Sequence, residues 1–151
     1  MNYERVGDVL NFIREFHKRA ERLFEAASEQ AAQGKLRMLL EWLAEREARF
    51  AEAIETFEKA PENSVLIQEW LQYLPELDAL ELDLPKIGAE MSVDDAMALA
   101  IAFDNYLVRL LDAVTATCHG REVCELFEQM LEQERGEGRA LARNLAEFQD
   151  I

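Results

Sequence analysis

The sequence has few basic residues and no long apolar run. Its 16 Lys and Arg residues face 31 Asp and Glu residues, which gives a formal net charge of -15. A charge of this sign repels nucleic acid and anionic membrane surfaces. No apolar stretch approaches the ~18 residues of a membrane span, and the charged N-terminal stretch lacks the apolar core of a secretory signal. We therefore expect no nucleic acid and no membrane among its partners, and a cytoplasmic location.

Cysteine is also scarce. Cys118 and Cys124 are the two cysteines of the chain, too few for a disulfide-stapled scaffold, and no Cys-x-x-Cys motif occurs. They lie six residues apart around His119, so a redox pair or a metal site that includes His119 is one interpretation. Two buried thiols at helix ends is the simpler one, and it is the one we expect.

The three prolines all fall between residues 61 and 85 and divide the chain. On both sides of them, apolar residues recur at steps of three and four, which predicts amphipathic helices. The pattern predicts two long helices broken near Gly34, before the prolines. After them it predicts a helix over about 93–117, opened by a capping box at Ser92-Val-Asp-Asp95, and a fourth helix beyond a turn at His119-Gly120.

The predicted architecture is all-α, a single domain over 1–151. It consists of a helical hairpin over 4–58, a crossover over 59–91 with a short helix within 64–73, and a second hairpin over 92–149. A crossover of this length is too long for a simple connection between adjacent helices, and it suits a four-helix bundle made of two hairpins. The apolar residues of 64–87 exceed what a connection needs, so we expect a homodimer.

The two hairpins look like copies of each other. LLEWLAERE at 39–47 aligns with LFEQMLEQE at 126–134, and FHKRAERLFEAA at 16–27 aligns with FDNYLVRLLDAV at 103–114. Helices rich in leucine and glutamate align easily by chance, but here one offset, from residue 39 to residue 126, serves both helix pairs without a gap. We therefore expect an internal repeat of 87 residues.

Ionisable residues interrupt the apolar stripe near the middle of each predicted helix. These inward positions hold His17, Glu47, Asp104, Glu134 and Glu137. Burial and mutual repulsion both disfavour charged carboxylates, so something must neutralise them. Candidates are protons, a metal ion bound by oxygen and imidazole ligands, or an arginine such as Arg46, Arg135 or Arg139.

Two glycines accompany the last pair of acids in the stretch EQERGEG, residues 132–138. Gly136 and Gly138 each cost roughly 1 kcal/mol relative to alanine inside a helix. They would permit a bulge or a close helix approach beside the acids, or they mark a kink or a tolerated weakness.

The repeated hairpin, the crossover and the inward acids together resemble the ferritin-like di-iron carboxylate superfamily, and within it the rubrerythrin-like group. There, each hairpin supplies one Glu from its first helix and a Glu-x-x-His from its second. At those positions this chain has His17, Glu47 and Phe50 in the first hairpin, and Asp104, Glu134 and Glu137 in the second. Glu47 and Glu134 match, whereas Phe50 is unable to coordinate a metal.

The resemblance implies a metal site of iron or manganese, mononuclear or asymmetric dinuclear, that acts on peroxide or dioxygen. Glu47 and Glu134 would bridge or hold ions, with Asp104, Glu137 and His17 as terminal ligands. The rubredoxin-like domain of full-length rubrerythrins is absent, so the electron donor would be external. The alternative is a metal-free, degenerate bundle that serves as a binding or dimerisation module. A generic bundle, unrelated to this superfamily, would instead scatter the acids over different levels.

Overall fold

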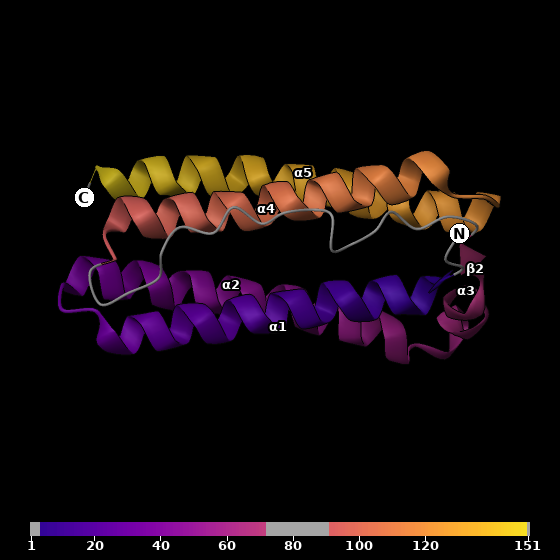
Figure 1. The fold of residues 1–151 in the computed structure, drawn as a ribbon, viewed down its shortest axis with the longest axis horizontal. Helices are drawn as coiled ribbons and strands as arrows, with labels where there is room; N and C mark the ends of the chain where they lie inside the picture. Colours follow the sequence, from indigo (N-terminus) through magenta and orange to yellow (C-terminus); the bar gives the residue numbers. More distant parts are fainter. Residues whose placement is uncertain (1–3, 72–90, 151) are drawn as a thin grey trace. The chain divides into compact units, whose positions relative to one another are not determined.

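The computed structural model describes residues 4–71 and 91–150 (Figure 1). Within these residues the chain forms five α-helices, a 3-10 turn and two strands of two residues each. The described chain divides into two compact units. The N-terminal unit comprises residues 5–69 and 91–100, and the C-terminal unit comprises Glu4, residues 70–71 and residues 101–150. The all-α class is confirmed.

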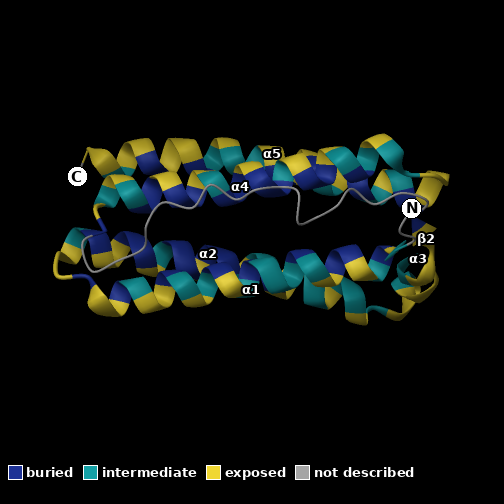
Figure 2. Cartoon of the chain, in the orientation of Figure 1, coloured by how far each residue is buried: buried dark blue, intermediate teal, exposed yellow. Residues whose placement is uncertain are grey.

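The N-terminal unit is built on α1 (Val6–Gln30) and α2 (Gly34–Lys59), which run antiparallel (Figure 1). The break between them falls next to Gly34, as predicted. Buried positions follow one side of each helix and exposed positions follow the other (Figure 2). On α1 the buried apolar residues recur at helical spacing and are Val6, Val9, Leu10, Ile13, Ala20 and Phe24.

Acidic side chains accept capping hydrogen bonds at the N-terminal ends of two helices. The Asp8 carboxylate accepts a hydrogen bond from the backbone N–H of Arg5 at 2.9 Å. At the start of α4 (Val93–Thr117), the Ser92 N–H donates to Asp95 and the Asp95 N–H donates to the Ser92 hydroxyl, each at 3.0 Å. This is the predicted capping box. The hydrogen bond from the Ser92 backbone lowers the pKa of Asp95.

The segment after α2 folds back onto the start of α1. It contains the 3-10 turn η1 (Pro61–Asn63) and α3 (Ser64–Gln68), so the predicted short helix is present. The backbone N–H of Val6 donates to the Glu69 carbonyl at 2.9 Å. Next to it, a Cβ placed on Gly7 would lie 2.7 Å from Cγ2 of Ile67. Gly7 therefore permits a close approach that a larger residue would prevent.

A short strand at the end of the described part of the crossover pairs with the start of the chain. β1 (Glu4–Arg5) and β2 (Trp70–Leu71) form a two-stranded sheet. The predicted crossover over 59–91 extends beyond this point, and residues 72–90 lie outside the described residues. Most of the apolar residues from which a homodimer is predicted, such as Leu74, Leu77 and Leu80, fall in that segment.

The C-terminal unit pairs α4 from residue 101 onward with α5 (Arg121–Gln149). The turn between them depends on Gly120, whose φ of 89° lies in the left-handed region that favours glycine. Helix α5 continues without interruption through Gly136 and Gly138, so neither glycine introduces a bulge. A Cβ on Gly136 would have Arg139 Nη2 at 3.7 Å, and one on Gly138 would have Asp104 Oδ2 at 3.9 Å, both ordinary contact distances.

The first residues of the four long helices, and the last residues of α1 and α4, agree with the predicted repeat of 87 residues. Helix α1 runs from residue 6 to 30 and α4 from residue 93 to 117, so both ends shift by 87 residues. Helix α2 begins at residue 34 and α5 at residue 121, which is the same shift. The burial of paired residues agrees as well. His17 and Asp104 are both buried, Glu47 and Glu134 are both buried, and Phe50 and Glu137 are both half-buried.

Cys118 and Cys124 form a disulfide, with Cα atoms 5.6 Å apart. The prediction of two buried thiols is therefore wrong. The turn at Gly120 brings the residue that follows α4 next to the first turn of α5, and both cysteines are half-buried rather than in the core. Across the residues that the structure describes, none of the helices combines the length and the apolar character that a membrane crossing requires.

Candidate functional site

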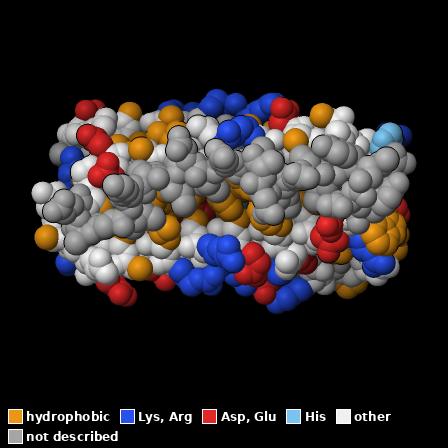
Figure 3. Space-filling model, viewed as in Figure 1, with side chains coloured by type: hydrophobic (Ala, Val, Ile, Leu, Met, Phe, Trp, Pro, Cys, Tyr) orange, Lys and Arg blue, Asp and Glu red, His pale blue; other side chains and the backbone are white. Residues whose placement is uncertain are grey.

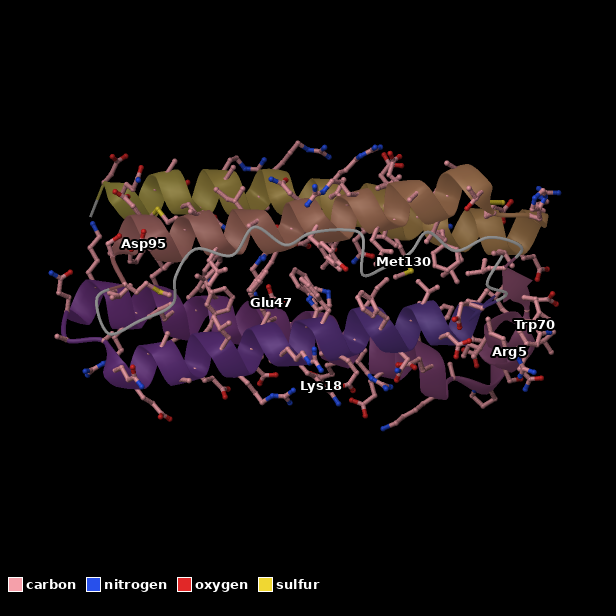
Figure 4. All side chains as sticks on the ribbon, viewed as in Figure 1. Arg5, Lys18, Glu47, Trp70, Asp95 and Met130 are labelled. Atoms are coloured by element: carbon pink, nitrogen blue, oxygen red, sulfur yellow. A yellow bond between two sulfur atoms is a disulfide. The ribbon has the colours of Figure 1, made fainter. Side chains whose placement is uncertain are left out.

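His17 and Glu47 meet inside the N-terminal unit. They come from the middle of α1 and α2, and their exposed fractions are 2% and 1%. His17 Nδ1 lies 2.5 Å from Glu47 Oε2. Since a carboxylate only accepts, the imidazole donates this hydrogen bond. Figure 4 labels Glu47 on α2 and Lys18 on α1, on opposite sides of the α1–α2 pair.

Arg46 completes this cluster. Its Nη1 lies 3.8 Å from Glu47 Oε1, and its guanidinium lies 4.8 Å from the centroid of the Phe50 ring. The His17 ring centroid is 5.1 Å from the same Phe50 ring. Phe50 thus packs against both partners of Glu47, at the position where the superfamily pattern has a metal-binding histidine. Both carboxylate oxygens of Glu47 have a polar or cationic protein neighbour, which compensates for its burial.

Asp104 on α4 and Glu134 on α5 are buried acids of the C-terminal unit. Their exposed fractions are 4% and 9%, and both line one groove of about 380 Å³ between α4 and α5. Gly138 lines the groove too, together with Arg135, Arg139 and apolar residues that include Ile101 and Leu141. Because Gly138 has no side chain, it leaves space beside the Asp104 carboxylate. Glu137 is half-buried and does not line this groove.

Four of the five predicted ligands lie in pairs, one pair within each unit, and Glu137 belongs to neither pair. His17 and Glu47 are hydrogen-bonded in one unit, and Asp104 and Glu134 border one groove in the other. In residues 4–71 and 91–150, no group of three or more His, Cys, Asp or Glu side chains has the arrangement to hold a metal ion. The buried positions of His17, Glu47, Asp104 and Glu134 agree with the sequence-based assignment of these residues to the inward faces.

Some surface acids lie beside basic side chains, and others line a groove together. Basic and acidic side chains lie side by side on the face shown in Figure 3, and on α1 Arg14 Nη1 pairs with Glu58 Oε1 at 2.8 Å. A separate groove of about 250 Å³ between α1 and α2 is lined by acids, including Glu21 and Glu25. Partial burial, followed by the charge of Glu25, raises the pKa of Glu21. This groove lacks a buried histidine or arginine partner among its lining residues.

The inward stripes of the sequence predict most of these residues, whereas their individual partners follow from the structure. His17 is predicted as a terminal metal ligand, and in the structure it is hydrogen-bonded directly to Glu47. One signal for that bond was available, since His17 and Glu47 both fall on inward stripes of adjacent helices. Arg46 is one of the three arginines predicted to be able to neutralise the acids, and its Nη1 lies 3.8 Å from Glu47 Oε1.

The fold is ferritin-like. Comparison with solved structures finds a Thermotoga maritima protein proposed to be a ferritin-like diiron-carboxylate protein, with a TM-score of 0.58 and 15% sequence identity, over 97% of this chain and 98% of that chain. At this level of identity the likeness concerns the fold. No protein-family model and no curated protein matches the chain.

Proposed function

We propose that the protein is a ferritin-like metal-binding protein whose ion is held mainly by the C-terminal unit. Asp104 and Glu134 would be the principal ligands. Glu137, three residues after Glu134, is on the same side of α5 and would be a further ligand. The observation that carries the proposal is the burial of two carboxylates on adjacent helices beside one groove.

The donor set in this unit fits a hard cation. Carboxylate oxygens suit iron(II) and manganese(II), and a divalent charge offsets the cost of burying two acids. Gly138 also lines the groove, where its missing Cβ would lie 3.9 Å from Asp104 Oδ2. The donors of the N-terminal unit fit less well. Glu47 is already hydrogen-bonded to His17 and lies near Arg46, so metal binding there would have to displace protein partners.

The proposed metal binding is therefore asymmetric. One ion is held well by Asp104 and Glu134, and His17 and Glu47 bind metal weakly at most. When bound, iron or manganese would supply one-electron chemistry toward peroxide or dioxygen, as the resemblance to rubrerythrin-like proteins implies. The buried acids would set the charge around the ion, and the groove would admit a small substrate. Electrons would come from an external donor.

Metal analysis of protein purified without chelator tests the proposal. We expect stoichiometric iron or manganese in the wild type and its loss in Glu134→Ala, because that change removes a buried oxygen ligand. Glu132→Ala is the matched control, since Glu132 is an exposed acid on the same helix, and it should retain the metal. Equal metal content in the Glu134 and Glu132 variants would contradict the proposed site.

A metal-free bundle that serves as a binding or dimerisation module is the second candidate. The observation in its favour is that Glu47 is compensated by His17 and Arg46 without a metal, and that Arg135 and Arg139 border the groove of Asp104 and Glu134. This candidate predicts a wild-type protein that remains free of metal after anaerobic reconstitution with iron(II) or manganese(II).

A further inference from the structure

The disulfide between Cys118 and Cys124 lies at the turn that joins α4 and α5. Cys118 follows the last residue of α4, and Cys124 belongs to the first turn and a half of α5. Both cysteines are half-buried, and the turn residues His119 and Gly120 between them are exposed. The bond thus lies at an exposed turn and not in the core of the helix pair.

The two sulfur atoms have different surroundings. Sγ of Cys118 lies 3.1 Å from the carbonyl oxygen of Thr115. A disulfide sulfur carries no hydrogen, but a Cys118 thiol at this place would donate a hydrogen bond to that carbonyl. Cys124 is near the N-terminal end of α5, and helical side chains tilt toward that end. The free N–H groups and positive dipole there favour a Cys124 thiolate.

The helices do not depend on this bond for their packing. Val114, one turn before Cys118, and Phe127 on α5 are fully buried, and Val123 on α5 is 4% exposed. Cys124 N–H also donates to the Gly120 carbonyl at 3.0 Å, a backbone hydrogen bond that is independent of the sulfur. Opening the disulfide should therefore change the turn and leave the helical core in place.

We propose that Cys118 and Cys124 form a thiol–disulfide exchange site that accepts two electrons from a low-molecular-weight thiol. The incoming thiolate attacks Sγ of Cys118, the bond between the two protein sulfurs breaks, and its electron pair leaves on Cys124 as a thiolate. A second thiol molecule then attacks the mixed disulfide and releases Cys118, which takes up a proton. Two small thiols become one small disulfide, and the protein gains two thiols.

Equilibration of the native protein in a series of reduced and oxidised glutathione mixtures tests this proposal. The chain has no other cysteine, so maleimide labelling after an acid quench reports on this pair alone. We expect both thiols to appear together and reversibly as the mixture becomes more reducing, with an unchanged far-UV circular dichroism spectrum. A bond that opens only in denaturant, that never forms, or whose opening unfolds the helices would overturn the proposal.

Two single-cysteine variants test the assigned roles. Cys118→Ser leaves Cys124 alone at the α5 terminus, and Cys124→Ser leaves Cys118 alone beside the Thr115 carbonyl. At neutral pH we expect iodoacetamide to alkylate Cys124 in the first variant several-fold faster than Cys118 in the second, since the thiolate is the reacting form. Equal rates, or a faster Cys118, would contradict the choice of Cys124 as the leaving sulfur. The readout needs no metal, so it is independent of the function proposed above.

Discussion

His17→Leu should lower the free energy of unfolding by about 3–5 kcal/mol, the range measured when one partner of a buried pair is removed. The variant leaves the Glu47 carboxylate buried without its 2.5 Å hydrogen bond, while Arg46 remains 3.8 Å away. Glu47→Leu in the same background should recover part of the loss, because it removes the orphaned acid. Urea unfolding followed by circular dichroism gives both values.

His119→Leu is the matched control for this cycle. His119 is exposed in the α4–α5 turn, so its replacement should change stability by no more than about 0.5 kcal/mol. The buried pair also predicts non-additivity, since contacting residues couple. If His17→Leu costs as little as the control, and the double variant is the sum of its parts, the hydrogen bond between His17 and Glu47 does not stabilise the N-terminal unit.

Gly7→Ala should destabilise the protein by about 1–3 kcal/mol, the usual cost of overpacking a close contact. The new methyl group would lie 2.7 Å from Cγ2 of Ile67 and 3.2 Å from its carbonyl oxygen. Relief requires α3 to move away from α1, which strains the hydrogen bond from Val6 to Glu69. The change is measured as a lower urea midpoint at an unchanged slope.

Gly136→Ala makes the same chemical change but should stabilise the protein. The nearest atom to its new methyl group is Arg139 Nη2 at 3.7 Å, which is an ordinary contact. We expect a gain of about 0.5–1 kcal/mol, because alanine is the better helix former. A Gly7→Ala variant as stable as Gly136→Ala would show that α3 does not pack closely on the start of α1.

Much of the fold follows from local pattern. The step of three and four residues sets the long helices, the prolines limit them, and Ser92 with Asp95 opens α4 at the predicted residue. The repeat could also be predicted from the sequence, because a single offset without a gap reflects the equal lengths of α1 and α4 and the equal spacing to the helix that follows each. The burial of His17, Glu47, Asp104 and Glu134 follows from the same periodicity.

Other features depend on side-chain geometry that periodicity does not encode. Whether Cys118 and Cys124 are thiols or a disulfide depends on how sharply Gly120 turns the chain, and a six-residue spacing is compatible with both. Likewise, an inward position does not tell which partner a buried side chain finds. Glu47 has neighbours on its own helix and on α1, and the hydrogen bond to His17 follows from the register of the two helices.

The contacts in the structure explain the residues at which this chain departs from the superfamily pattern. With Phe50 in place of a histidine, the N-terminal unit gains a ring that contacts both His17 and Arg46, and these two residues compensate Glu47. The C-terminal unit keeps carboxylates at the corresponding positions, and Asp104 and Glu134 line a groove there, whereas Glu137 does not. This difference between the two copies is the basis for the proposed asymmetry in metal binding.

Anomalous diffraction from crystals grown with manganese(II) and recorded at a wavelength where manganese scatters anomalously would test the central proposal most directly. We expect one strong anomalous peak within bonding distance of Asp104 and Glu134, and a weak peak or none at His17 and Glu47. A strong peak at His17 and Glu47, or no peak beside Asp104 and Glu134 in crystals saturated with manganese, would contradict it.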